Sequence, residues 1–262
     1  MRQATNRRSD DVGDAAHTRC VRHNDAVSTP GRRSTGRLLV LVAAACLLVG
    51  CTSTVTGSAV RDPASAPAHV GSVKESDIDE IMLTVDEIGD IVGARDLQVI
   101  LETGEMSDNA DSVSDPDCLG AIFGAEDAVY EGTDWTAVRD QVVGDDEDQR
   151  KHWVEQTVVL YPSERQAREF FDDSSTAWDQ CAGFSVAVDD YEATYIWHVE
   201  DLETRDDVIA QITVQEDFDD WQCQHALSTV SNLTVETWAC AFGVNDEAVE
   251  IAERMLQNAA SR

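Results

Sequence analysis

Cysteine is the residue type in this sequence whose spacing points most directly to chemistry. Cys51 ends the tetrapeptide LVGC, in which an aliphatic residue stands three positions before the cysteine and a small residue stands directly before it. This is the pattern of a bacterial lipobox, where the thiol receives diacylglycerol. Arginines precede the uncharged run of residues 38–49, which is too short to span a bilayer core of about 30 Å as a helix. We therefore expect residues 1–50 to be a lipoprotein-type signal peptide and Cys51 to carry the lipid anchor, with palmitate among its acyl chains.

Four further cysteines follow the predicted export signal, which favours disulfide bonds because the compartment outside the membrane is oxidising. Two strand-like runs, residues 221–230 and 233–242, flank a predicted two-residue turn at 231–232. In such a hairpin, the numbers of two residues that lie opposite each other sum to 463. Cys223 and Cys240 fulfil this sum and fall on a non-hydrogen-bonded pair, where Cα atoms approach to about 4.5 Å, within the span of a disulfide. Cys118 and Cys181 are then left for each other. No Cys-x-x-Cys motif favours a metal site instead.

Catalytic motifs are absent from the sequence. It contains no G-x-S-x-G, G-x-G-x-x-G, Walker or H-E-x-x-H pattern. His198 and Glu200 have the H-x-E spacing of zinc deaminases, but the P-C-x-x-C partner is missing. We expect His225 to pack opposite Trp238 in the hairpin and His152 to be solvated at the start of a strand. The prediction is a protein without enzymatic activity, cofactor or metal.

Acidic residues outnumber basic ones by 51 to 19, which gives a formal net charge of −32. The excess lies after residue 50, where 47 acidic and 11 basic side chains remain. Such a chain repels nucleic acid, which binds proteins through Lys and Arg. The acidic turns at residues 145–148 and 217–220 could hold Ca²⁺ through clustered oxygens. Neither has the EF-hand order of ligands, and we favour solvated turns.

Aromatic residues are the candidates for a ligand site. Trp153, Tyr195 and Trp197 alternate onto shared faces of strands that are predicted to be adjacent, where core packing alone would favour Val and Ile. Ligand pockets combine apolar walls with few polar groups. We therefore take these three residues as candidate ligand contacts, with packing in a core or an interface as the alternative interpretation.

Composition divides the exported part of the chain into a tether and a domain. Residues 51–75 are rich in Ser, Thr, Ala, Gly and Pro without apolar periodicity, which is typical of a flexible linker. Such a linker has a reach of roughly 25 to 30 Å. Residues 76–262 contain no second linker, so we expect them to form one folded domain.

Hydrophobic periodicity in that domain predicts helices at both ends of a run of strands. Thr84 and Glu87 form a capping box before a helix that ends at Gly93, and apolar residues recur at helical spacing after Ser163. The predicted helices are residues 77–83, 85–92, 116–123, a segment after Ser163, and 246–258; the predicted strands are residues 135–143, 152–161, 192–199, 207–215, 221–230 and 233–242. This order predicts an α+β fold with an antiparallel β-sheet and helices packed on one side. The polar residues that alternate along 207–215 are expected on the other face.

Several short motifs occur in a characteristic order within residues 76–260. They are Asp117-Cys118, Tyr130, Trp135-Thr136-Ala137-Val138-Arg139, Tyr161-Pro162-Ser163, Trp178 followed by Cys181, and Trp221-Gln222-Cys223. With the four cysteines and the closing helix, they resemble the PknH-like extracellular sensor domain family. This domain is found outside the membrane in a mycobacterial receptor Ser/Thr kinase and also alone in lipoproteins.

The resemblance implies a mixed α/β domain with a large cleft for an unidentified ligand. It also implies disulfides that join the first cysteine of the domain to the second and the third to the fourth. The Gly-rich loop and the His-Arg-Asp and Asp-Phe-Gly motifs of a kinase do not occur in this sequence, so we expect no phosphorylating activity.

Taken together, these features favour a lipid-anchored, extracytoplasmic sensor or ligand-binding domain on the outer face of the cell membrane, within the cell envelope. Its expected partners are the membrane through the anchor, a small-molecule or envelope ligand, and a membrane protein that could pass a signal inward. Three alternatives remain. A lipid or glycolipid carrier requires a continuous apolar cavity, an envelope hydrolase requires converging titratable groups, and a scaffold for envelope proteins requires a large exposed apolar patch.

Overall fold

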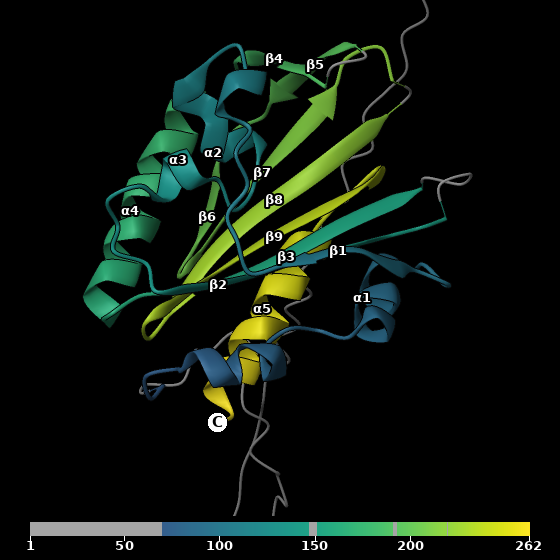
Figure 1. Ribbon diagram of the computed structural model, residues 1–262. Helices are drawn as coiled ribbons and strands as arrows, with labels where there is room; N and C mark the ends of the chain where they lie inside the picture. The colour runs from purple at the N-terminus through teal and green to yellow at the C-terminus, as the bar shows by residue number, and fades with distance from the viewer. Residues whose placement is uncertain (1–69, 147–150, 191–192, 219) are drawn as a thin grey trace, which may run out of the picture. The chain divides into compact units, whose positions relative to one another are not determined.

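A nine-stranded antiparallel sheet organises the residues that the computed structural model describes, which are 70–146, 151–190, 193–218 and 220–262 (Figure 1). Its strand order is β1-β2-β3-β9-β8-β7-β5-β4, and β6 also pairs with β7. The strands are β1 (Gln98–Thr103), β2 (Ala137–Gly144), β3 (His152–Leu160), β4 (Ser185–Asp189), β5 (Thr194–Val199), β6 (Glu203–Arg205), β7 (Val208–Gln215), β8 (Trp221–Val230) and β9 (Leu233–Phe242). The predicted signal peptide, Cys51 and the tether before residue 70 lie outside the described residues.

The β8–β9 hairpin has the predicted register. Cys223 lies opposite Cys240, their Cα atoms are 4.0 Å apart, and their sulfur atoms form a disulfide. Ser231 in the turn has a φ of 52°, as a tight two-residue turn requires. Because side chains alternate with a period of two, this register also decides which residues of both strands face each side of the sheet.

Helices cover both faces of the sheet, which corrects the prediction that they would lie on one side. Ala226 and Leu227 are neighbours on β8 and point to opposite faces, yet both are buried in separate apolar cores. In Figure 1, α2 (Leu119–Ile122), α3 (Asp127–Tyr130) and α4 (Glu164–Cys181) lie against one face. The helices α1 (Val85–Val92) and α5 (Glu247–Ala260) lie against the other. The polar residues Gln211 and Thr213, predicted on the face of β7 opposite the apolar ones, are both buried.

The helices Val85–Val92 and Glu164–Cys181 begin directly after the predicted starting residues Thr84 and Ser163. Thr84 accepts a hydrogen bond from the Glu87 amide, the Glu87 carboxylate accepts one from the Thr84 amide, and Gly93 ends α1 with a φ of 69°. The helices are η1 (Glu75–Glu80), α1 (Val85–Val92), η2 (Ala110–Ser112), η3 (Pro116–Cys118), α2 (Leu119–Ile122), α3 (Asp127–Tyr130), α4 (Glu164–Cys181) and α5 (Glu247–Ala260). None of these described helices has the length and apolarity needed to cross a membrane.

The strands that the sequence pattern does not predict lie at or beside the sheet edges. Strand β1 is an edge strand in which Val99, Ile100 and Leu101 are all exposed, and its pairing shifts register between Val99 and Leu101. The irregularity removes the alternation of buried and exposed residues that marks a strand. Strands β4 and β6 have only five and three residues, which is too short for a clear periodic signal.

The N-terminal segment of the domain is fixed to the turn of the β8–β9 hairpin. The Val73 amide donates to Oδ1 of Asn232 over 2.7 Å, and Nδ2 of Asn232 donates to the carbonyl oxygens of Val73 and Tyr161 over 3.1 and 3.0 Å. Asn232 is buried, and all of these bonds are therefore shielded from water. The packed region thus includes Val73, three residues before the predicted start of the domain.

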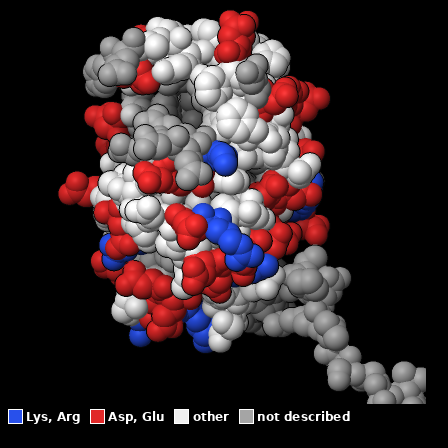
Figure 2. Space-filling view, turned by 90° about the vertical axis from the view of Figure 1, so that its right-hand side faces the viewer, with Lys and Arg blue, Asp and Glu red and all other residues white. Residues whose placement is uncertain are grey.

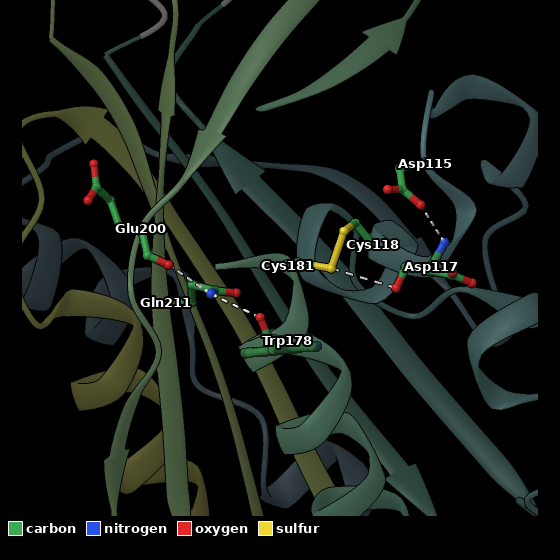
Figure 3. The surroundings of a disulfide bond; sticks show 7 residues. All are labelled: Asp115, Asp117, Cys118, Trp178, Cys181, Glu200 and Gln211. Carbon is green, nitrogen blue, oxygen red and sulfur yellow. Dashed lines mark hydrogen bonds between the residues drawn. A yellow bond between two sulfur atoms is a disulfide. The ribbon is translucent and has the colours of Figure 1, made fainter. Parts of the chain in front are cut away.

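A second disulfide joins Cys118 to Cys181 and fastens the end of α4 to the η3–α2 segment (Figure 3). Close to it, Nε2 of Gln211 on β7 donates to the carbonyl oxygens of Trp178 and Glu200, over 3.2 and 2.9 Å. The disulfide connects the last turn of α4 to the η3–α2 segment, and the Gln211 side chain connects it to the sheet. Both disulfides that the sequence predicts are therefore present.

Replacing both cysteines of a disulfide with serine should lower the free energy of unfolding more for Cys118–Cys181 than for Cys223–Cys240. The two bridges span sequence separations of 63 and 17 residues. The chain-entropy model then gives losses of about 4 and about 3 kcal/mol. Urea unfolding of the two double variants measures both values. A larger loss for the shorter bridge would show that native packing, rather than loop closure, decides the difference.

Candidate functional site

Aromatic side chains gather at the end of the sheet opposite the β8–β9 turn. We define the aromatic surface as Trp153 on β3, Trp197 on β5, Phe218 in the β7–β8 turn, Trp221 on β8 and Phe242 on β9. Its three tryptophans are half-buried and pack around the Cys223–Cys240 disulfide and Trp238. Its two phenylalanines are about half exposed, at 48% for Phe218 and 51% for Phe242. Large apolar side chains therefore meet solvent beside a covalent crosslink.

The outer rings of the aromatic surface contact one another. The ring centroids of Trp221 and Phe242 are 5.1 Å apart with an interplanar angle of 72°, and those of Phe218 and Phe242 are 6.0 Å apart at 27°. Phe218 also meets Trp221 edge-on at 6.2 Å. Edge-to-face and offset arrangements are the favourable ones for aromatic pairs. The protein's own packing thus holds these rings together at the surface.

Two of the three predicted ligand contacts belong to the aromatic surface. Trp153 and Trp197 both pack near the disulfide, whereas Tyr195 is exposed farther along β5, opposite Val188 of β4. The expectation that their strands are adjacent is wrong, because β9, β8 and β7 lie between β3 and β5. The intervening β8–β9 hairpin comes last in the sequence and inserts into the middle of the sheet.

Phe218, Trp221 and Phe242 are not among the residues predicted from the sequence. The signal for two of them is present in the hairpin register, because 221 and 242 also sum to 463 and the two residues pair across the hairpin. The same arithmetic that pairs the cysteines therefore predicts an aromatic pair two residues away on the same face.

Four carboxyl groups are buried under the helices on the same face of the sheet. We call them the buried acid group: Glu126 before α3, Asp140 on β2, Glu155 on β3 and Glu236 on β9. Glu155 is two residues from Trp153 and lies opposite Trp238. This places the group beside the inner end of the aromatic surface.

Hydrogen bonds to neutral groups satisfy much of the buried acid group. Glu236 accepts from the Tyr130 hydroxyl over 2.9 Å and from the Ala125 amide over 3.1 Å, and its other oxygen lies 2.8 Å from Nε2 of His225. Asp140 accepts from the Thr157 hydroxyl over 2.7 Å. No Lys or Arg contacts these carboxyl groups among the described residues, so their charges lack cationic partners.

Burial changes the protonation of this region. Loss of solvation raises the pKa of Glu155 well above its ordinary value, and the neighbouring charges of Asp140 and Glu236 raise it further. Burial likewise raises the pKa values of Asp140 and Glu126. These carboxyl groups therefore retain protons at pH values where exposed carboxyl groups are charged.

His225 is a neutral, packed residue rather than a catalytic one. Its ring lies between those of Trp178 and Trp238, with centroids 3.9 Å away on each side, which confirms the predicted packing opposite Trp238. Burial lowers the pKa of its imidazole, so the contact with Glu236 is a hydrogen bond donated by Nε2 of a neutral ring. His225 supplies no positive charge to offset the acids.

One buried donor beside the acids has no partner. Nε1 of Trp238 makes no hydrogen bond in the described part of the chain. This atom and Oε1 of Glu155 each lie 3.2 Å from the position that a Cβ on Gly124 would occupy. A side chain at Gly124 would therefore press on both groups. An unpaired buried donor is costly, and it marks a position where a ligand oxygen or a water molecule would be favourable.

The remaining histidines do not form a reactive site. His152 is half-buried rather than solvated, because its Nδ1 lies 3.1 Å from a carboxylate oxygen of Asp145. Nδ1 of His198 lies 3.0 Å from the Ser185 hydroxyl. No group of His, Cys, Asp or Glu within the described ranges is arranged to hold a metal ion. The two acidic turns considered for Ca²⁺ lie partly outside those ranges.

A cavity of ≈ 250 Å³ lies where the end of α1 meets the start of β3, the end of β9 and the start of α5. Its lining is Val92, Lys151, His152, Ala239, Cys240, Ala241, Phe242, Gly243, Val244 and Glu247. It is smaller than the several hundred Å³ that a lipid carrier requires.

Comparison with known proteins identifies relatives of this domain. Residues 73–258 match the family described as PknH-like extracellular domain. The serine/threonine-protein kinases PknH of Mycobacterium bovis and Mycobacterium tuberculosis are each 32% identical to the chain over 184 residues, which is 70% of this chain. The chain spans about a third of the length of these relatives, 31% and 29% respectively.

A solved structure shows the same fold. The crystal structure of the extracellular domain of PknH from Mycobacterium tuberculosis superposes with a TM-score of 0.70 at 30% sequence identity. The match covers 74% of this chain and all of that one. The resemblance based on short motifs and four cysteines is therefore confirmed.

Replacing Glu155 with glutamine should raise the free energy of unfolding at neutral pH by about 1 kcal/mol or more, because folding must either bury the Glu155 charge or bind a proton to it, and glutamine requires neither. The pKa of Glu155 is raised in the folded state, so its penalty is absent below the ordinary value of about 4.3, grows as the pH rises from there towards the folded value, and stays constant above the folded value. Wild-type stability should therefore fall relative to the variant as the pH increases.

Urea unfolding at several values from about pH 4.5 to about pH 8 measures this difference. Glu131→Gln is the matched control, since Glu131 is an exposed glutamate that directly follows α3. Parallel pH profiles for the wild type and Glu155→Gln would contradict the proposed burial of a titrating carboxyl group.

Proposed function

The chain belongs to the family of PknH-like extracellular domains, and on this premise we propose that it is a lipid-anchored, extracytoplasmic domain of sensor type that binds a ligand without catalysis. The observation that carries the proposal is the aromatic surface, in which five rings are assembled and partly exposed next to a disulfide. Exposed contiguous aromatic area is typical of recognition sites. The two disulfides are consistent with an oxidising compartment.

The LVGC tetrapeptide supports an anchor at Cys51 in the outer leaflet of the cell membrane. Residues 52–72 would then link the lipid to Val73, the first buried residue of the domain. A lipoprotein needs a membrane protein to carry a signal inward, so we include such a partner in the proposal.

The envelope hydrolase is the second candidate, because the buried acid group brings together carboxyl groups with raised pKa values. Raised pKa values are what a general acid requires. However, these carboxyl groups are buried, and Asp140 and Glu236 accept hydrogen bonds from protein groups. A substrate would have to displace the helix layer to reach them, which favours a non-catalytic domain.

The scaffold alternative has support at a different place. Val99, Ile100 and Leu101 are exposed in succession on edge strand β1, whose outer edge lacks a partner strand among the described residues. Exposed edges of this kind pair with strands of other proteins. The small cavity supports a lipid carrier less well, because ≈ 250 Å³ holds only a fraction of a lipid.

Replacing Cys51 with alanine should abolish lipidation and move the protein from the membrane fraction to the soluble or secreted fraction. The reason is that the acyl chains supply the membrane affinity of an anchored domain. Metabolic labelling with palmitate and fractionation measure both effects. Cys46→Ala is the matched control and should remain labelled and membrane-bound. Loss of labelling in Cys46→Ala instead would show that Cys46, and not Cys51, carries the lipid.

Native mass spectrometry of the lipoprotein, released gently from its own envelope, should detect a bound non-protein molecule. The proposal predicts an added mass that remains at moderate activation and disappears on unfolding. Recovery of a stoichiometric protein partner without a small molecule would favour the scaffold alternative. Turnover of an envelope component by the purified protein would favour the hydrolase.

A further inference from the structure

The aromatic surface runs across the strands of the sheet rather than along one of them. Its members lie on β3, β9, β8 and β5, and β7 completes the row between β8 and β5. Neighbouring strands are about 4.8 Å apart, so the row from β3 to β5 extends over roughly 19 Å. The rings therefore offer contacts to an extended ligand rather than to a single small group.

Unused hydrogen-bonding groups border these rings. Gln215 on β7 lies opposite Trp197 on β5, and continuation of the β7–β8 register places it opposite Trp221. Its half-buried side chain makes no hydrogen bond to any described residue. Nε1 of Trp238 is also unpaired, but it is buried beside Glu155 and lies beneath the surface that a ligand would contact. The Gln215 side chain can pair with a hydroxyl group without breaking an existing bond.

The surroundings of the aromatic surface are acidic. Glu216, Asp217 and Asp220 are exposed in the same β7–β8 turn as Phe218. Lys151, two residues before Trp153, offers one positive charge against them. Figure 2 shows acidic side chains over much of the face it presents, with few basic ones. This charge disfavours phosphate groups, carboxylate polymers and anionic lipid headgroups as ligands.

The aromatic surface lies far from the point where the tether joins the domain. Val73 is bonded to Asn232 at the turn of the β8–β9 hairpin, whereas Trp221 and Phe242 lie at the opposite end of the same two strands. Each strand has ten residues, which corresponds to roughly 30 Å. A domain held by this tether can present the surface to envelope material beyond the membrane.

We propose that the aromatic surface binds a neutral oligosaccharide segment of an envelope polysaccharide. The electron-rich faces of Trp and Phe rings attract the positively polarised C–H groups on one side of a sugar ring. Gln215 hydrogen-bonds a sugar hydroxyl, and the acidic surroundings tolerate an uncharged chain. This inference rests on the proposed function and adds the chemical class of the ligand.

A cationic ligand is the main rival, because cations also bind aromatic faces. Phe218, Trp221 and Phe242 contact one another directly, with centroids 5.1 to 6.2 Å apart, so a cation cannot sit between them, and Trp153 and Trp197 continue the surface across the sheet. An extended neutral chain uses the whole row, whereas a quaternary ammonium group would use one or two rings. The rival is therefore an outcome of the test below.

The test uses the mature lipoprotein in a detergent without a sugar headgroup, because a glycosidic detergent would compete. Isothermal titration measures binding of cellohexaose, maltohexaose and the neutral polysaccharide fraction of the producing cells' envelope, with choline and spermidine as cationic probes. We expect the neutral fraction to bind and the cations not to. Phe242→Ala and Trp221→Ala should each weaken binding by about tenfold or more.

Phe184→Ala is the matched control, because Phe184 is 53% exposed, close to the 51% of Phe242, but lies outside the aromatic surface. It should bind as the wild type does. Circular dichroism and urea unfolding confirm that the variants fold.

Three results would overturn the inference. They are equal affinity of Phe242→Ala and wild type, binding of the cationic probes alone, and no binding of the neutral fraction. If native mass spectrometry still recovers another ligand, the proposed function stands and only the ligand class is wrong. If no ligand of any kind is recovered, both fail.

Discussion

The register of the β8–β9 hairpin is the constraint on which the rest of the structure depends. It pairs Cys223 with Cys240, His225 with Trp238 and Trp221 with Phe242 on one face of the two central strands. A slip by one residue would turn every one of these side chains to the other layer. The disulfide excludes such a slip, because a slip by one residue would turn the two sulfur atoms to opposite faces of the sheet.

The two ends of the sheet differ in how far the helices cover them. Toward the hairpin turn, helices bury both faces, and buried polar groups such as the Gln211 amide nitrogen and the Glu236 carboxyl group hydrogen-bond inside the protein. Toward the opposite end, Phe218 and Phe242 meet solvent. Glu155 lies between these regions, and burial makes its charged form costly to the domain. Such a cost at the inner end of an aromatic surface is typical of a site retained for recognition rather than for stability.

Local signals in the sequence predict much of the fold. The hairpin, both disulfides, the capping box at Thr84 and the core face of α4 follow from spacing and residue type. Tertiary features do not. Edge strand β1 lacks an alternating pattern because its pairing is irregular, and burial of Gln211 depends on a helix that lies far away in the sequence. Two of the three predicted ligand contacts lie on the aromatic surface, yet its most exposed ring, Phe242, becomes visible only when the register is applied beyond the cysteines.

The central claim is that the aromatic surface created by this register is where the ligand binds. Two-dimensional NMR of the indole N–H groups tests it most directly, because the chain has six tryptophans and three of them belong to the surface. On addition of the neutral envelope polysaccharide fraction, the account predicts shifts at Trp153, Trp197 and Trp221, with Trp135 unchanged. Shifts confined to Trp135, or bound ligand that leaves all three surface resonances in place, would contradict it.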